Sequence, residues 1–410
     1  MRTANRDLMK EWNKKLVLNL IREKELISQV EIFKKSGISA GTVANITREL
    51  RSQRFIENIG RGESNGGRRP ILFRFNPRAR YVISAAFFAM ETRVAILDLG
   101  GNILQKVAYP TRPERGKEYV FDEFRQRVEA LLLQLSIPKE KVIALGASFE
   151  GAVNADTGSL LFSAHFRWRD TPVKRILEES LGLRTFVENE SRAMALAECW
   201  FGVGKKINNM VLVTIESGIG AAIIFNGQIY RGANQMEGEI GHILTVPNGP
   251  LCRCGKRGCL EAVASGSAIF RKAVESVQKG VKTIIPKGIN HLPERKVIKI
   301  IFQSADEGDK LSRQILQSAC RHLGQALANI VNYADPQMIV LTGYVVEEDP
   351  GILLKEIQKE FQKAVLGRGM REVKIVKGEL GEDAVLIGGA TLAYQDMFSL
   401  PREEESCLKF

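Results

Sequence analysis

The chain has 410 residues, of which 44% are hydrophobic and 26% charged, a composition typical of a folded protein with two or more domains. Its longest apolar runs fall short of the roughly 18 residues that a membrane span needs, and its polar start lacks the apolar core of a secretory signal. We therefore expect a cytoplasmic protein without a membrane partner. The net charge of +12 is uneven, because residues 1–80 hold 18 basic and 8 acidic side chains. Basic charge confined to one segment predicts a module that binds a polyanion.

Residues 1–80 predict a winged helix-turn-helix domain. Apolar side chains at helical spacing indicate a first helix over 15–22, and Ser28 is a candidate N-cap for a second helix that ends at Gly37. A third helix is predicted over 42–51, and in this motif the third helix enters the major groove of DNA. The polar side chains that we expect to reach DNA from this helix and the turn before it are Ser39, Thr42, Asn45, Arg48 and Arg51.

A wing is predicted after the third helix. Two short apolar segments, 55–57 and 71–75, frame a glycine-rich stretch, as expected for two strands around a flexible tip. Its Gly-Gly-Arg-Arg-Pro sequence at 66–70 resembles a hook that inserts arginines into a narrow minor groove. The candidate wing contacts are Arg61, Arg68 and Arg69. The alternative is a winged helix that binds protein and leaves these charges solvated.

From residue 81 onward the pattern changes to α/β. Apolar runs bounded by turn signals predict strands, and longer amphipathic stretches predict helices such as 191–201 and 311–333. The strands are expected at 81–89, 94–99, 103–108, 142–147, 185–187, 210–215, 220–225, 228–230, 338–341 and 373–376. Two similar lobes follow from this order: 81–205 with 385–400, and 206–384. Residues 401–410 are predicted to be a solvated tail, and the basic segment 275–300 is left unassigned.

Four side chains within eighteen positions offer one imidazole and three thiolates: His242, Cys252, Cys254 and Cys259. Glycines flank the cysteines, as a tight metal-binding knuckle requires. A Cys₃His set fills the tetrahedral shell of zinc and leaves no position for an activated water, so it predicts a structural zinc site. The alternatives are buried thiols beside a surface histidine, or a disulfide.

Together these motifs resemble the ROK family of sugar kinases and sugar-responsive transcriptional repressors. The resemblance lies in the winged helix with GGRRP, in YRGANQMEGEIGH at 230–242, in CRCGKRGCLE at 252–261 and in NYADPQMIVLTG at 332–343. The appended winged helix points to the repressor branch. The resemblance implies an actin-like, ribonuclease H-like body of two lobes, with a sugar cleft between the lobes, a structural zinc and a homodimer or homotetramer.

The resemblance also implies which residues contact the sugar. Carried over residue by residue, they are Asn189, Glu239, His242 and Glu261, with Glu190 where the family's kinases have a catalytic aspartate. His165 falls near a position often held by a sugar-binding asparagine. Amide and carboxylate groups suit a polyol. The alternative is that Glu239 and Glu261 are ordinary surface or capping acids.

Phosphoryl transfer is not expected. The family's first phosphate loop falls on residues 86–90, which hold no glycine, hydroxyl or carboxylate, and Glu216 opens the second loop with a negative charge. Glu190 is one methylene longer than the catalytic aspartate. We therefore predict a DNA-binding repressor that senses a sugar or sugar derivative and is not an enzyme. Two alternatives remain: an ATP-dependent sugar kinase with a DNA module, and a zinc lobe that docks a sugar-transport protein.

Overall fold

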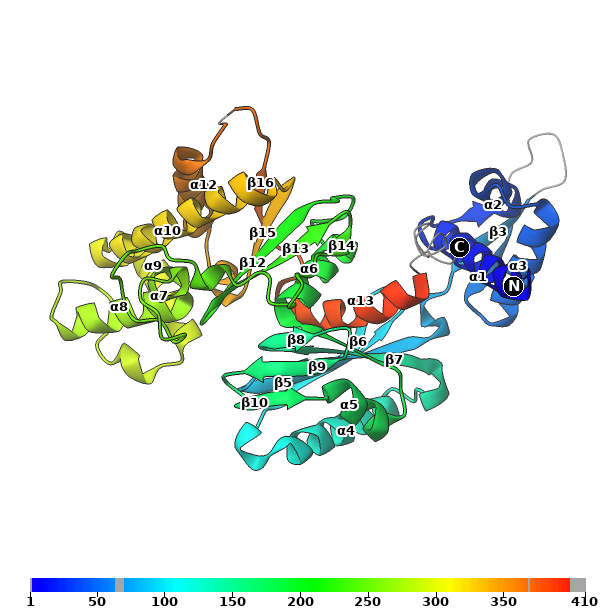
Figure 1. Cartoon of the computed structure of the whole chain (residues 1–410), viewed down its shortest axis with the longest axis horizontal. Helices are drawn as coiled ribbons and strands as arrows, with labels where there is room; N and C mark the ends of the chain where they lie inside the picture. The colour runs from blue at the N-terminus through cyan, green and yellow to red at the C-terminus, as the bar shows by residue number, and fades with distance from the viewer. Residues whose placement is uncertain (1, 63–69, 368, 399–410) are drawn as a thin grey trace.

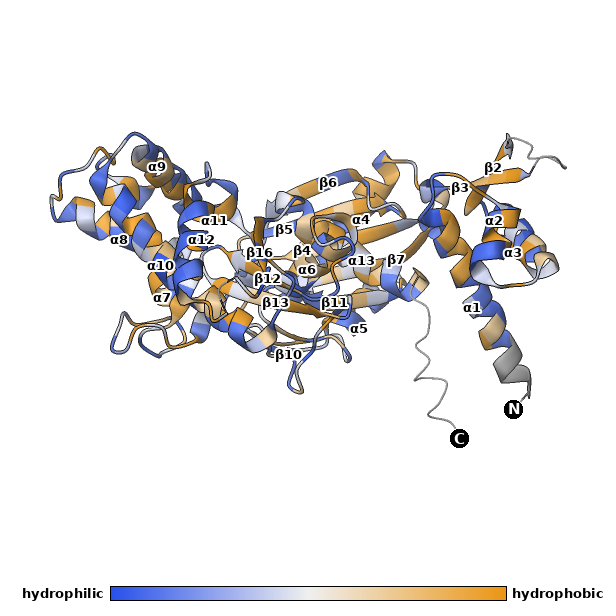
Figure 2. Ribbon diagram, turned by 90° about the horizontal axis from the view of Figure 1, so that it is seen from above, coloured by the Kyte–Doolittle hydropathy of each residue, from blue (hydrophilic) through white to orange (hydrophobic). Residues whose placement is uncertain are grey.

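The computed structural model describes residues 2–62, 70–367 and 369–398 (Figure 1). The molecule is elongated, with the winged helix-turn-helix at one end, the lobe that carries α8 (Gly266–Gln278) and α9 (Glu294–Asp306) at the other, and the remaining lobe between them (Figure 2). Among the described residues, no helix combines the length and apolarity needed to cross a membrane.

The predicted winged helix-turn-helix is confirmed. Its elements are α1 (Arg2–Arg22), β1 (Ile27–Ser28), α2 (Gln29–Ser36), α3 (Ala40–Ser52), β2 (Ile56–Arg61) and β3 (Ile71–Phe75). Ser28 caps α2 in a reciprocal pair with Glu31, and Gly37 ends the helix at a φ of 69°. The first helix begins at Arg2, well before residue 15, because its mostly polar early residues favour a helix without giving it an apolar stripe.

The first lobe is built on a mixed sheet with the strand order β11-β7-β4-β5-β6. Its strands are β4 (Tyr81–Phe87), β5 (Glu91–Asp98), β6 (Ile103–Pro110), β7 (Val142–Phe149) and β11 (Thr185–Asn189). Two helices, α4 (Lys117–Gln134) and α5 (Val173–Leu181), bury their apolar side chains in the core on one side of this sheet. A small antiparallel sheet of β8 (Ala152–Asn154), β9 (Ser159–Ser163) and β10 (Trp168–Thr171) was not predicted.

The second lobe repeats this plan, with the strand order β14-β13-β12-β15-β16. Its strands are β12 (Met210–Ile215), β13 (Ile219–Phe225), β14 (Gln228–Ile229), β15 (Met338–Thr342) and β16 (Lys374–Lys377). Besides α8 and α9, its helices are α7 (Leu260–Ala264), α10 (Lys310–Ala334), α11 (Tyr344–Glu347) and α12 (Ile352–Ala364). The unassigned segment 275–300 contributes the end of α8 and the start of α9, and its Val297 and Ile298 are buried in the core of this lobe.

Two helices lie between the sheets of the two lobes. α13 (Ala384–Phe398) packs on β4 and β7, α6 (Glu190–Phe201) packs on β12 and β13, and the two helices pack on each other (Figure 1). Glycine makes their close approach possible, because a Cβ added at Gly388 would lie 2.0 Å from the carbonyl oxygen of Ala193. The predicted two-lobed α/β body is therefore confirmed, with a two-helix layer at its centre.

We predict that Gly388→Ala destabilises the protein, because the clash is with backbone and no side chain can move to relieve it. The expected loss is at least about 2 kcal/mol in the free energy of unfolding, measured by urea denaturation. The matched control is Gly41→Ala in α3, where an added Cβ meets nothing within 4 Å. That variant should be neutral or slightly stabilising. Equal stability of the two variants would show that α6 and α13 can separate freely.

Candidate functional site

A cavity of about 540 Å³ lies between the two lobes. The first lobe contributes residues from the end of β7, from the β9–β10 turn and from the start of α6, and the second contributes the β12–β13 turn and the segment around 235–242. The structure brings all six predicted sugar contacts to this one cavity: His165, Asn189, Glu190, Glu239, His242 and Glu261.

Asn189 holds the start of α6 at the edge of this cavity. Its Oδ1 accepts hydrogen bonds from the backbone N–H groups of Ser191 (2.9 Å) and Arg192 (3.2 Å), which makes it the N-cap. Its Nδ2 donates to the carbonyl oxygen of Gly151 (3.0 Å) and to Glu190 Oε2 (2.6 Å). Burial, followed by the charge of nearby Glu150, raises the pKa of Glu190 well above its ordinary value. Glu190 is thus shifted toward its protonated form.

A chain of polar contacts crosses the cleft. Glu150 Oε1 lies 2.5 Å from His165 Nδ1, and Arg253 Nη1 of the second lobe lies 3.2 Å from His165 Nε2. Arg253 also donates to the carbonyl oxygen of Ser217 (3.3 Å) and lies 3.6 Å from Glu261 Oε1. Because a guanidinium can only donate, Nε2 of His165 accepts and Nδ1–H donates to Glu150. Sequence reasoning missed Arg253, although its position between two cysteines of the knuckle was a usable signal.

A buried ion cluster fixes the wall of the cleft and was also missed. Arg192 pairs with Glu188 (2.7 Å) and Glu237 (2.5 Å), and Glu188 also pairs with Arg231 (2.5 Å). The side chains of Arg192, Glu188 and Glu237 are at least 92% buried, so removing one partner would leave an uncompensated charge. The spacing of four residues between Glu188 and Arg192 was a usable local signal, but their contacts with Glu237 and Arg231 depend on the tertiary fold.

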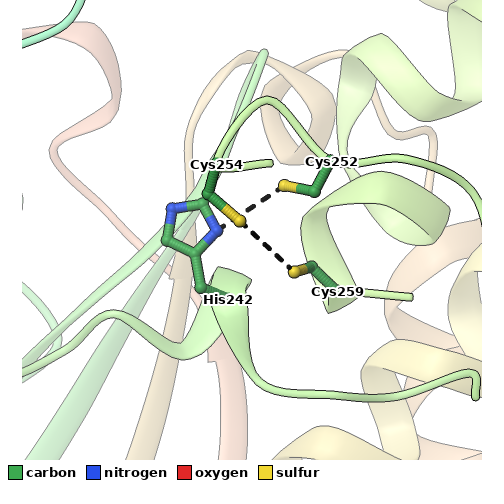
Figure 3. Close-up of side chains that lie close together, drawn as sticks. All are labelled: His242, Cys252, Cys254 and Cys259. Atoms are coloured by element: carbon green, nitrogen blue, oxygen red, sulfur yellow. Dashed lines mark hydrogen bonds between the residues drawn. The ribbon is translucent and has the colours of Figure 1, made fainter. Parts of the chain in front are cut away.

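The four predicted metal ligands converge (Figure 3). Their ligand atoms all lie within 4.8 Å of one another, with Cys252 Sγ 3.7 Å from His242 Nδ1 and Cys254 Sγ 3.7 Å from Cys259 Sγ. Bonds of about 2.3 Å to sulfur and 2.0 Å to nitrogen in a tetrahedron would place ligand atoms about 3.5–3.8 Å apart. The geometry therefore fits a four-coordinate metal ion, whereas a disulfide needs sulfurs about 2.05 Å apart.

Backbone turns shape this cluster. The N–H of Cys252 donates to the carbonyl oxygen of Lys256 (2.8 Å), and Gly255 and Gly258 have φ angles of 85° and 79°. The backbone N–H of Lys256 lowers the pKa of the Cys254 thiol, which favours the thiolate that a metal binds.

The cluster also borders the cleft. His242 turns Nδ1 toward the thiols, while its Nε2 lies 3.8 Å from Glu239 Oε2. Glu261 follows Cys259 by two residues and accepts a hydrogen bond from the N–H of Ile219 (3.3 Å). The knuckle thus positions two of the carboxylates that were predicted to bind sugar.

The predicted DNA contacts lie on the outer side of α3. At about 100° per residue, Asn45 and Arg48 fall opposite the buried Val43 and Leu50. Both are exposed, and Arg48 Nη1 donates to Asn45 Oδ1 (3.1 Å).

The structure describes only some of the remaining predicted DNA contacts. Ser39 is exposed and caps α3 by accepting from the N–H of Thr42 (3.2 Å), while Thr42 and Arg51 flank the exposed face. Arg61 ends β2. Arg68 and Arg69, with the predicted hook, lie outside the described residues.

The segment predicted to replace the first phosphate loop forms the β4–β5 hairpin. Phe87 is buried and stacks on Phe149 with ring centroids 4.5 Å apart. The N–H of Ala89, at the tip, donates to Glu150 Oε2 (3.3 Å). A carboxylate of the chain itself is therefore bonded to a backbone donor of this loop.

A second cavity of about 280 Å³ lies beside this hairpin. Burial raises the pKa of Glu216 to about 7, and the charge of Glu347 adds to the shift. Arg295, at the same cavity, pairs with Glu347, Glu348 and Glu382. Side-chain carboxylates thus line this second cavity.

Comparisons with known proteins agree with this architecture. A model described as the ROK family matches residues 89–396, and one described as winged helix-turn-helix DNA-binding matches residues 13–57. The N-acetylglucosamine repressor of Escherichia coli O157:H7 is 29% identical over 396 residues, which cover 97% of this chain and 95% of the relative. A glucokinase of Halalkalibacterium halodurans is 33% identical over 330 residues, covering 80% of this chain and 99% of the enzyme.

A solved structure is also similar along the whole chain. It is a ROK family transcriptional regulator described as a homologue of the Escherichia coli MLC protein, with a TM-score of 0.81, 27% identity, and coverage of 95% of this chain and 97% of that one.

Fold and site together define a winged helix-turn-helix module joined to a two-lobed α/β body with a polar cleft. The chain belongs to the ROK family, as the match over residues 89–396 shows. The resemblance inferred from the sequence motifs is thereby confirmed.

We predict that Glu150→Gln lowers the pKa of His165. The hydrogen bond from His165 to Glu150 is the main reason that this pKa lies above its usual value of about 6.5, so the variant should titrate closer to that value. Imidazole ¹H–¹⁵N spectra over a pH series measure the shift. The pairing contributes to folding stability below pH of about 6.5, and this contribution is lost as the pH rises through the raised pKa.

The control for this measurement is Glu114→Gln. Glu114 lines a neighbouring cavity together with His165 but forms no hydrogen bond or ion pair with it among the described contacts. An unchanged titration in Glu150→Gln would show that the cleft contact does not persist in solution.

Proposed function

We propose that this protein is a transcriptional repressor that binds DNA through its winged helix-turn-helix and senses a sugar or sugar derivative in the cleft of its ROK body. The observation that carries this proposal is the similarity of the chain, along nearly its full length, to a repressor. The exposed polar face of α3 and the polar cleft supply the two sites that such a protein needs. Binding to a chromosomal operator also implies a cytoplasmic protein.

Double-stranded operator DNA is the first partner. Asn45 and Arg48, at the centre of the exposed face of α3, suit bidentate contacts with adenine and guanine in the major groove. Ser39, Thr42 and Arg51 flank them, and Arg61, Arg68 and Arg69 would place positive charge from the wing on the minor groove. A homodimer or homotetramer would present two such modules to two half-sites.

The effector is proposed to be a carbohydrate. Carboxylates of Glu239 and Glu261 accept hydrogen bonds from hydroxyl groups, and the Asn189 amide both donates and accepts, a combination that suits a polyol. Glu190, His165 and His242 complete the lining. The name of the repressor relative makes N-acetylglucosamine the first probe.

The body is proposed not to be an enzyme. A phosphate would have to displace Glu150 from the N–H of Ala89 and would also meet the carboxylate of Glu216. The glucokinase relative is the reason to keep an ATP-dependent sugar kinase as the alternative, but its similarity covers 80% of this chain, against 97% for the repressor.

Zinc is the metal that we propose for the Cys₃His cluster. Three thiolates and an imidazole are soft or borderline ligands that favour zinc and fill its shell, so the ion would cross-link the knuckle without activating water. His242 and the three cysteines would hold it, and the knuckle would keep Arg253 and Glu261 at the cleft.

We predict that Arg48→Ala weakens operator binding by 5- to 150-fold, equivalent to about 1–3 kcal/mol for a lost base contact. The probe is a duplex selected from random DNA by the purified protein, and Kd is measured by fluorescence anisotropy at fixed salt. The control is Arg175→Ala, because Arg175 is exposed on α5 and pairs with Glu179. The control should bind like the unaltered chain.

The same assay tests the effector. Adding N-acetylglucosamine, or glucose as the sugar of the enzyme relative, should change the operator Kd by at least fivefold. Enrichment of no duplex would refute the DNA-binding proposal. Release of ADP from ATP in the presence of glucose would establish the kinase alternative.

We also predict that Cys254→Ser removes zinc and the response to sugar but spares DNA binding. Bound zinc, measured by mass spectrometry, should fall from about one ion per chain to near zero, because three ligands hold zinc poorly. The operator Kd without sugar should stay within about twofold, since α3 lies in another domain. Cys199→Ser, outside the cluster, is the control. Equal loss of both functions would indicate general unfolding and contradict a local role.

A further inference from the structure

Helix α6 touches both the cleft and the DNA-binding domain. Its first residues, Glu190 to Arg192, line the cavity, and Trp200 near its other end lies under the guanidinium of Arg22, the last residue of α1, with 5.0 Å to the ring centroid. Twelve residues at about 1.5 Å each make this helix about 18 Å long. A single rigid helix thus spans from the proposed effector to the domain that holds α3.

We propose that α6 transmits the state of the cleft to the winged helix-turn-helix, and that the stacking of Arg22 on Trp200 is the contact through which α1 follows α6. This inference rests on the proposed function, because it assigns the regulation of the same cleft. Arg22 is a positioning residue here and touches neither DNA nor effector.

The N-terminal end of α6 lies at the cleft, where a bound ligand can contact it. The Asn189 amide is divided between the carbonyl oxygen of Gly151 in the β7–β8 turn and the carboxylate of Glu190. A polyol hydroxyl that replaces one of these two partners alters the hydrogen bonds that hold the start of α6 against the β7–β8 turn. Because the start of α6 is capped by this same asparagine, the change acts directly on the helix backbone.

The first turn of α6 is tightly coupled to α13, so little of a displacement is absorbed between them. Gly388 of α13 packs on the backbone of Ala193, and a Cβ added at Gly146 of β7 would lie 1.7 Å from the carbonyl oxygen of Gly389. Contacts of backbone on backbone leave no flexible side chain to take up a shift. α6 and α13 therefore move together.

Helix α1 contacts the C-terminal ends of α6 and α13. The guanidinium of Arg22 lies 4.3 Å from the ring centroid of Phe398, so Arg22 contacts both helices. Asn19 Nδ2 donates to the carbonyl oxygen of Phe398 (2.6 Å), and Arg184 fixes Asp396 with two hydrogen bonds of 2.5 and 2.8 Å. Burial lowers the pKa of Arg22, consistent with a poorly hydrated cation held by aromatic rings.

A shift of α1 reaches the DNA-contacting helix. Val17 and Ile21 of α1 share one hydrophobic cluster with Val43 and Leu50 of α3. Helix α1 also packs directly on α3, so a shift of α1 relative to the body would carry α3 with it. In an oligomer this movement alters the spacing of the two recognition helices, on which binding to two half-sites depends.

The test compares Arg22→Ala with Arg80→Ala, using the selected duplex and N-acetylglucosamine or glucose as probes. Arg80 stacks on Phe55 at 5.1 Å, which is the same type of contact near the same junction, and none of its described hydrogen bonds or ring contacts is with α6 or α13. Arg22→Ala should reduce the sugar-induced change in operator Kd from at least fivefold to less than twofold. The operator Kd without sugar and the sugar Kd from calorimetry should each stay within about threefold. Arg80→Ala should keep the full response.

Two substitutions of Trp200 distinguish the stacking contact from general packing. Trp200→Phe keeps a ring beneath the guanidinium and should retain most of the response, whereas Trp200→Leu should lose it. An undiminished response in Arg22→Ala, or equal losses in Arg22→Ala and Arg80→Ala, would overturn the proposal.

A sugar-free double-mutant cycle keeps this inference separate from the proposed effector. Asn189→Ala should change the operator Kd by at least threefold when Arg22 is present and leave it unchanged in the Arg22→Ala background. An equal effect in both backgrounds, or none in either, would overturn the coupling. If neither sugar shifts the operator Kd of the unaltered chain, the proposed effector fails while the cycle still decides the coupling.

Discussion

The packing of α6 on α13 is the contact on which the rest of the structure depends. Gly388 lets the two backbones meet at Ala193, and each helix also covers the sheet of one lobe. Residues of both sheets, both helices and the winged helix-turn-helix form one continuous hydrophobic cluster. The cleft and the DNA-binding domain are therefore attached to the same two-helix unit, so a change at one site has a physical route to the other.

We propose that the body has lost a phosphate site while keeping the fold around it. The hairpin of 86–90 remains, but Glu150 now accepts a hydrogen bond from the N–H of Ala89. The same carboxylate pairs with His165, which in turn contacts Arg253 across the cleft. In this proposal, a phosphate at this loop would have to break contacts that join the two lobes.

The sequence predicts best those features that short-range patterns determine. The strands and amphipathic helices have a clear period, and the Cys₃His donors lie within eighteen positions. α13 was missed as a helix because it is apolar on all sides, as its place between two sheets requires. Although the spacing of Glu188 and Arg192 was a usable signal, the pairing of Arg192 with Glu237 was missed because it joins segments that only the tertiary fold brings together. The contact of Arg22 with Trp200 escaped prediction for the same reason.

The charge distribution separates the two kinds of ligand. Basic residues exceed acidic ones by ten in residues 1–80, whereas the cavity between the lobes is lined by glutamates, of which Glu190, Glu216 and Glu239 have raised pKa values because of burial. Excess basic charge attracts a polyanion to the first region, whereas the cleft between the lobes has no such excess. The hydroxyl groups of an uncharged polyol both donate and accept hydrogen bonds, so they can pair with glutamates in either protonation state. The charge distribution therefore supports the proposal that DNA binds residues 1–80 and that a sugar binds the cleft.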